Sequence, residues 1–128
     1  MRILVVDDKP AILNSLSELL TAHGYLIDTA HHGLAASEKL QNTDYDLFII
    51  DHLMPVMNGI QLTKHVRQLE NYNTNTPIIF MTTQGQNAVK LVCDTSLFNA
   101  IVDKPIDEQN LLKLINDLLS SNTRYQLL

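Results

Sequence analysis

Short apolar runs, each stopping at a polar residue, alternate along this chain with segments whose apolar residues recur at helical spacing. A continuous run such as residues 3–6 or 47–50 is typical of a parallel strand that is covered on both faces. Residues 25–30 alternate polar and apolar side chains, which indicates a half-exposed edge strand. Strands are expected at residues 3–6, 25–30, 47–50, 78–81 and 100–102, and helices at 10–23, 34–40, 58–69, 88–93 and from Asp107 onward.

Five strands that alternate with five helices predict an α/β protein with a doubly wound, five-stranded parallel sheet. Parallel strands need crossover connections, and these place helices on both faces of the sheet. The length of 128 residues suits one domain. We expect this domain to span residues 1–120, and residues 121–128 to form a polar C-terminal tail. A polar connection is expected over residues 70–76.

Composition restricts the partners and the compartment. The formal net charge of −5 and the scattering of the nine Lys and Arg residues disfavour direct binding to nucleic acid. The apolar runs are too short to span a membrane. Cys93 is the single cysteine, so no intrachain disulfide can form, and we find no signal peptide. A cytoplasmic protein that does not insert into a membrane is therefore expected.

Polar residues stand at the ends of four predicted strands, namely Asp7 and Asp8, Asp51, Thr82, and Lys104. Ligands of doubly wound sheets bind beyond the carboxyl ends of the strands, so we expect all five residues on one rim. Singly, each has an ordinary alternative, because Asp7 and Asp8 could be turn residues and Lys104 a solvated charge. Together, three carboxylates at a partly buried sheet edge would repel one another unless a cation lay among them. Oxygen ligands with room for water favour Mg²⁺.

These motifs resemble the receiver domain of two-component response regulators, in its single-domain, chemotaxis-regulator-like form. The resemblance covers almost the whole chain. Its matching residues are Asp7-Asp8, Asp51, Met54-Pro55, Asn58-Gly59, Pro77-Ile78-Ile79, Thr82 and Lys104-Pro105. A receiver domain implies the flavodoxin-like fold with strand order 2-1-3-4-5.

The resemblance implies a phosphoacceptor signalling domain and not an enzyme, a domain that promotes only its own Mg²⁺-dependent phosphorylation and autodephosphorylation. Asp51 would accept the phosphoryl group from a sensor histidine kinase or a histidine phosphotransfer protein. The signal would pass to a separate downstream effector, and a homodimer formed on phosphorylation is a further implied partner. The fourth helix, fifth strand and fifth helix would build the contact surface.

Individual roles in the site also follow from the resemblance. The implied Mg²⁺ ligands are Asp7, Asp8, Asp51 and the backbone carbonyl of Leu53. Lys104 would pair with one phosphoryl oxygen, and Thr82 would move to donate its hydroxyl to another. The peptide bond between Lys104 and Pro105 is expected to be cis. His52 is interpreted as a loop side chain whose backbone N–H can face the phosphoryl group.

Three alternatives stay open. A phosphatase of the haloacid-dehalogenase type needs a second acid two residues after its nucleophilic Asp, where this chain has Leu53. A flavodoxin-like flavin carrier needs a Ser/Thr/Gly-rich phosphate loop, where this chain has Asp7-Asp8-Lys9-Pro10. The third is a receiver-like interaction module with weak or absent phosphorylation-driven switching. Ile101 bears on it, because family members commonly carry Tyr or Phe at that place.

Two further departures from the family pattern carry expectations. Residues 95–100 replace a turn that usually contains Gly. Thr83 follows Thr82 where the family usually has Ala or Gly, and its larger side chain should crowd the water that attacks the phosphoryl group. A long-lived phosphorylated state is therefore expected, with a modest readout centred on residues 83–87.

Overall fold

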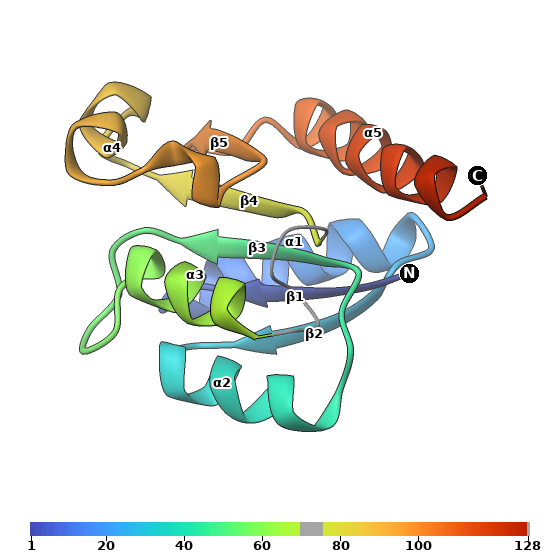
Figure 1. The fold of residues 1–128 in the computed structure, drawn as a ribbon. Coiled ribbons are helices and arrows are strands. Elements are labelled where there is room, and N and C mark those ends of the chain that lie inside the picture. The colour runs from blue at the N-terminus through green and yellow to red at the C-terminus, as the bar shows by residue number, and fades with distance from the viewer. Residues whose placement is uncertain (70–75, 128) are drawn as a thin grey trace.

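The computed structural model describes residues 1–69 and 76–127, with side chains described as far as Ser120 at the C-terminal end. Most of the connection expected over residues 70–76 lies outside the described residues. Strands and helices alternate along the chain (Figure 1). The strands are β1 (Arg2–Val6), β2 (Leu26–Ala30), β3 (Leu47–Asp51), β4 (Ile78–Thr82) and β5 (Ala100–Asp103). The helices are α1 (Pro10–Ala22), α2 (Gly33–Asn42), α3 (Gly59–Gln68), α4 (Gln86–Val92) and α5 (Glu108–Leu127), with a 3₁₀ helix at Thr95–Leu97.

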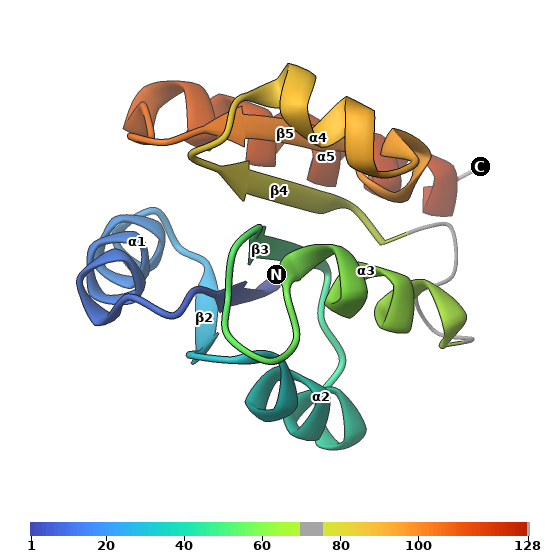
Figure 2. The ribbon, with the colours of Figure 1, turned by 90° about the vertical axis from the view of Figure 1, so that its left-hand side faces the viewer.

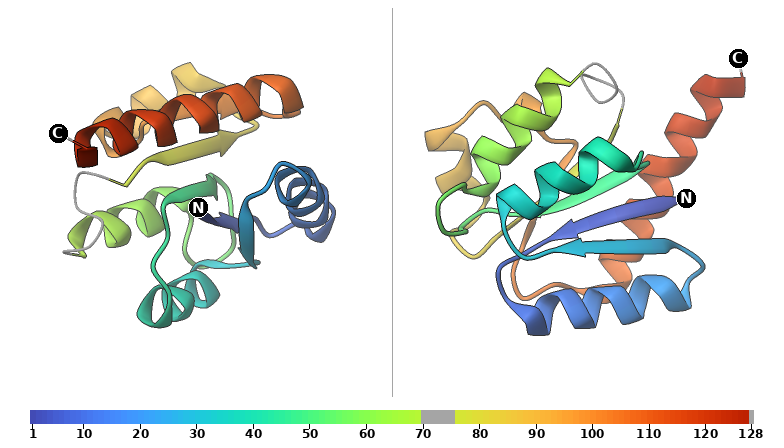
Figure 3. Two further views of the ribbon diagram at one scale, coloured as in Figure 1. Left: turned by 90° about the vertical axis from the view of Figure 1, so that its right-hand side faces the viewer. Right: turned by 90° about the horizontal axis from the view of Figure 1, so that it is seen from below.

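All five strands form one parallel sheet in the order β2-β1-β3-β4-β5, which confirms the predicted fold class and strand order. Helices α1 and α5 pack on one face, and α2, α3 and α4 on the other. The right-hand view of Figure 3 shows strands between α1 on one side and α2 and α3 on the other. Because the strands run in parallel, their carboxyl ends lie along one edge.

Side-chain alternation in the strands builds the two cores. In β1, Ile3 and Val5 face α1 and α5, whereas Leu4 and Val6 face the opposite helices. The inner strands β3 and β4 are buried at every position because helices cover both of their faces. Strand β2 is half-exposed, as expected of an edge strand. No described helix is both long and apolar enough to cross a membrane.

Helix ends follow local sequence signals in most places. Asn58 and Gln61 form a reciprocal capping box at the start of α3. Asp107 accepts a hydrogen bond from the backbone N–H of Asn110, which confirms its predicted role as the cap of α5. Helix α5 continues to Leu127, so the expected C-terminal tail is helical as far as that residue. No Gly or Pro occurs after residue 107 to stop it, and polar residues alone do not end a helix. The domain boundary at residue 120 stays a prediction.

Candidate functional site

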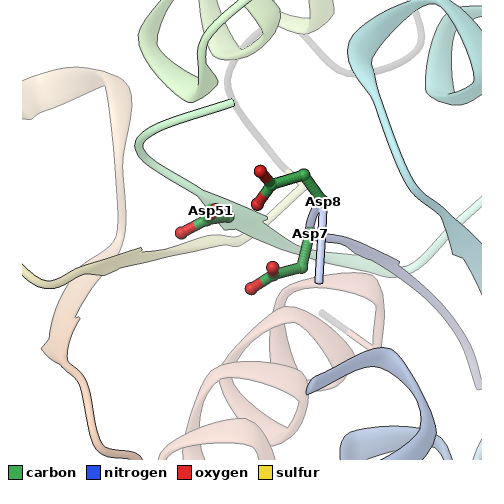
Figure 4. Close-up of side chains that lie close together, drawn as sticks. All are labelled: Asp7, Asp8 and Asp51. Carbon is green, nitrogen blue, oxygen red and sulfur yellow. The ribbon is translucent and has the colours of Figure 1, made fainter. Parts of the chain in front are cut away.

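Three carboxylates gather at the carboxyl end of the sheet. Asp7 and Asp8 follow β1, and Asp51 is the last residue of β3. Figure 4 shows the three side chains pointing into a common space from these two neighbouring strands. One oxygen from each lies within 4.8 Å of the others, with Asp7 and Asp51 buried and Asp8 partly buried. Strand order therefore brings together residues that are 43 positions apart in the chain, as the sequence predicts.

Lys104, which follows β5, joins this cluster. Its Nζ atom lies 2.7 Å from Asp7 Oδ2 and 2.9 Å from Asp51 Oδ1, so one ammonium group donates to both carboxylates. The prediction that Lys104 points inward is confirmed. The peptide bond between Lys104 and Pro105 is cis, as the resemblance implies.

Burial controls the electrostatics of the pair formed by Asp51 and Lys104. Burial raises the pKa of the Asp51 carboxyl, and the negative charge of Asp7 adds to the rise, although the Lys104 hydrogen bond opposes it. Burial by itself lowers the pKa of Lys104, but hydrogen bonds to Asp7 and Asp51 outweigh it and leave the pKa raised. Lys104 is therefore a fixed cation, and it offsets only part of the negative charge of three acids.

The donor set fits a hard divalent cation. Asp8 Oδ1 and Asp51 Oδ2 are buried oxygens that accept no hydrogen bond from any described residue. Buried oxygens of this kind usually have a partner, and a cation is the partner that suits oxygens of three neighbouring carboxylates. Carboxylate oxygens with space for water suit Mg²⁺. Leu53, whose backbone carbonyl is the fourth expected ligand, lies in the β3–α3 loop, and its role stays a prediction.

A contact between Thr82 and His52 was not predicted from the sequence. Thr82 ends β4 and is fully buried, and its Oγ1 atom lies 3.0 Å from Nδ1 of His52 and accepts the backbone N–H of Gln84 at 3.0 Å. His52 lies in the loop that follows β3, as interpreted, but its ring is buried. The backbone N–H of His52 donates to the Met81 carbonyl at 2.9 Å, so the expectation that this N–H faces a phosphoryl group is wrong.

The position of His52 has a simple geometric cause. Asp51 pairs with Met81 in the sheet, and the hydrogen bond from the His52 N–H to the Met81 carbonyl sets His52 beside Thr82. Burial lowers the pKa of the imidazole, which favours its neutral form. Side-chain alternation past Asp51 is a sequence signal that could have shown which face His52 points to, because His52 shares the face of Ile50.

Close packing against the end of β3 requires glycine at position 59. A Cβ atom at this position would lie 2.0 Å from the backbone oxygen of Asp51. The first turn of α3 therefore presses directly on the end of β3 and helps to fix Asp51. The loop between β3 and α3 reaches α2 (Figure 2). Met57 of this loop lies against Gly33, and a Cβ atom at position 33 would be 2.7 Å from Met57 Sδ.

Residues 95–100 hold their turn without glycine. Asp94 caps the 3₁₀ helix through the backbone N–H of Ser96, and Phe98 stacks on Phe80 with ring centroids 4.1 Å apart. Asn99 Oδ1 accepts hydrogen bonds from the backbone N–H of Ile78 and from Arg67, which also donates to the Leu97 and Thr76 carbonyls. Sequence reasoning missed the anchoring role of Arg67.

The chain belongs to the response regulator receiver domain family, whose model matches residues 3–116. It is 36% identical over 124 residues to chemotaxis protein CheY1 of Helicobacter pylori strain J99, and this match covers 95% of this chain and 99% of that protein. It is 31% identical over 119 residues to PilH of Pseudomonas aeruginosa, which covers 93% of this chain and 98% of PilH. A CpxR homolog of Haemophilus influenzae is 30% identical over 118 residues, but the chain spans only 50% of that transcriptional regulatory protein.

Solved structures agree with this assignment. CheY4 of Vibrio cholerae superposes with a TM-score of 0.85 at 32% identity, over 91% of this chain and 97% of that one. TrrA of Thermotoga maritima, solved in complex with Mg²⁺ and BeF, gives a TM-score of 0.80 at 32% identity over the same shares. This chain is thus a CheY-like receiver domain of two-component signalling. Domains of this family are signalling modules that interact with kinases and effectors and generally use Mg²⁺, and the Asp7, Asp8 and Asp51 pocket is consistent with a phosphoacceptor site.

Proposed function

We propose that Asp51 accepts the phosphoryl group, with Asp7, Asp8 and the Leu53 carbonyl as its partners in holding Mg²⁺. The observation that carries this proposal is the state of the two Asp51 oxygens. Oδ1 is held by Lys104 at 2.9 Å, whereas Oδ2 is buried and accepts no hydrogen bond from the described residues. Lys104 thus holds Oδ1 in place, whereas Oδ2 remains available for a bond that the unphosphorylated chain does not make.

The chemistry is an in-line displacement. A carboxylate oxygen of Asp51 attacks the phosphorus of phosphohistidine, the P–N bond breaks, and its electron pair leaves with the imidazole of the donor. Bound Mg²⁺ would neutralise charge on the phosphoryl oxygens. Lys104 then pairs with one of these oxygens and the Thr82 hydroxyl donates to another. Water later cleaves the acyl phosphate, which is the autodephosphorylation step.

The test is the intact mass after incubation with a small acyl-phosphate donor. One phosphoryl group should be added in Mg²⁺, and none in the presence of a chelator. Asp51→Asn should abolish the addition, whereas Asp103→Asn should retain it, because Asp103 is an exposed acid at the end of β5. A modification that survives Asp51→Asn would falsify the assignment. An unmodified wild type would instead favour the receiver-like interaction module, for which Ile101 is the supporting observation.

Partners follow from the proposed chemistry. The protein would act in the cytoplasm, where a sensor histidine kinase or histidine phosphotransfer protein would supply the phosphoryl group and a separate effector would receive the signal. Phosphorylation-dependent homodimerisation is the additional option. Sedimentation with and without beryllofluoride, a mimic of the phosphoryl group, tests it, and an unchanged mass would remove the homodimer and leave the effector.

A further inference from the structure

A buried hydrogen bond joins the residue after the acceptor to the hydroxyl that is expected to report phosphorylation. Nδ1 of His52 lies 3.0 Å from Oγ1 of Thr82, and both residues are buried, with exposed fractions of 7% and 0%. Within the described part of the chain, the other group bonded to this hydroxyl is the backbone N–H of Gln84. No described hydrogen bond joins Thr82 Oγ1 to Asp51 or to Lys104.

The direction of this hydrogen bond follows from the groups around the hydroxyl. The Gln84 N–H is a donor, so it occupies a lone pair of Oγ1 and cannot receive the hydroxyl proton. A buried hydroxyl proton needs an acceptor, and Nδ1 of His52 is the one within reach among the described residues. The Thr82 O–H therefore donates to Nδ1, and the imidazole proton is assigned to Nε2.

The His52 ring is held by packing and cannot readily follow a movement of Thr82. Its centroid lies 5.2 Å from that of Phe80, at an interplanar angle of 46°. Phe80 is fully buried and is itself stacked on Phe98. A Thr82 hydroxyl that turned toward a phosphoryl group on Asp51 would therefore have to leave Nδ1.

We propose that His52 is a positioning residue that retains the Thr82 hydroxyl proton in the unphosphorylated chain and so opposes the switch. This role rests on the proposed function of Asp51 and Thr82. On phosphorylation the hydroxyl exchanges Nδ1 for a phosphoryl oxygen, and Nδ1 loses its partner. Removing the acceptor should shift the equilibrium toward the phosphorylated arrangement. A typical intramolecular hydrogen bond contributes about 1 kcal/mol, which corresponds to about fivefold in affinity.

The decisive variant is His52→Phe, which keeps an aromatic ring against Phe80 and removes the acceptor. In Mg²⁺, it should bind beryllofluoride about fivefold more tightly than wild type. His52→Asn, which retains an acceptor near the place of Nδ1, should restore binding to within about twofold of wild type. Phe98→Leu is the packing control, because it loosens the same ring stack without touching Thr82, and it should leave the affinity unchanged.

A double-mutant cycle separates the hydrogen bond from general packing. In a Thr82→Val background, the change His52→Phe should have no further effect on beryllofluoride affinity. An unchanged or weaker affinity of His52→Phe would overturn the proposal, as would an equal gain in the Thr82→Val background or in Phe98→Leu. Wild type that fails to bind beryllofluoride at all overturns the proposed function itself, and the role of His52 falls with it.

A spectroscopic measurement on the unsubstituted chain tests the same proposal and does not depend on whether the variants fold. The ¹⁵N resonance of His52 Nδ1 reports whether this atom accepts a hydrogen bond. It should shift toward the value of a free imidazole acceptor when beryllofluoride binds. Saturation with beryllofluoride without such a shift would mean that the hydrogen bond survives the switch, and the proposal would be wrong while the function of Asp51 stands.

Discussion

Replacing Asp8 by Asn should make the metal-free fold more stable, although it removes a proposed metal ligand. The Asp8 carboxylate lies within 4.8 Å of the carboxylates of Asp7 and Asp51. Lys104 forms ion pairs with these two acids, and among the described residues no ion pair joins it to Asp8. The cation paired with Asp8 is Lys9, at 3.7 Å, and its side chain is 62% exposed, so this pair contributes little.

The magnitude follows from Coulomb's law. Two unit charges 4.8 Å apart repel by about 3.5 kcal/mol at an effective dielectric constant of about 20. Asp8 faces two such charges, but its side chain is 28% exposed and Lys104 offsets much of their charge. After this screening we expect Asp8→Asn to raise the free energy of unfolding by about 1–2 kcal/mol in the absence of metal.

Urea unfolding at neutral pH, in chelator and in Mg²⁺, measures the effect. Wild type should gain about 1.4 kcal/mol when Mg²⁺ is at ten times its dissociation constant, and Asp8→Asn should gain clearly less. Asp103→Asn is the matched control, because Asp103 is exposed and should change neither stability nor the Mg²⁺ response. A loss of stability of Asp8→Asn in chelator would refute the repulsion argument. An undiminished Mg²⁺ gain would remove Asp8 from the ligand set.

The stability of the metal-free chain should also depend on pH. Burial raises the folded-state pKa of Asp51 above its ordinary value of 3.8, so between the two values the native state binds more protons than the unfolded chain. Stability in chelator should therefore increase as pH falls through this window. Protonation of Asp51 also removes one charge that repels Asp8. The advantage of Asp8→Asn over wild type should thus be largest above the window and shrink within it.

Three further substitutions test separate features. Gly59→Ala should destabilise the fold by about 3 kcal/mol or more in urea unfolding, because its Cβ would meet the Asp51 carbonyl. Gly24→Ala is the comparison, because the space around Gly24 is open and its φ is +90°. A loss of unfolding free energy in Gly59→Ala no larger than that in Gly24→Ala would contradict this prediction. Thr83→Ala should release phosphate severalfold faster than wild type, and an equal rate would refute the steric argument. Val56→Gly should stabilise by about 0.5–1 kcal/mol, since an exposed β-branched residue at φ 67° is strained, and a loss of stability would show otherwise.

Sequence patterns predicted the sheet and its functional rim because both depend on local signals. Apolar runs that end at Asp7, Asp51 and Thr82 locate the carboxyl ends of three strands, and parallel topology then places them together. The partner of His52 could not be read in the same way, because it depends on the register between β3 and β4, which is a long-range property. The anchoring by Arg67 was missed for the same reason, since its partners lie 9 to 32 positions away in the chain.

The location of the aromatic residues connects the departure at Ile101 with the role proposed for His52. Ile101 is half-buried in β5, and its carbonyl accepts a hydrogen bond from the Gln86 side chain at 3.1 Å, so this edge is already tied to α4. A chain of ring contacts instead runs from His52 through Phe80 to Phe98, beneath the surface. A Thr82 hydroxyl that leaves His52 therefore acts first on a packed interior, where displacements are small because few voids can absorb them. The absence of an aromatic at position 101 and the presence of a buried ring beside Thr82 both favour a response that is local to the site.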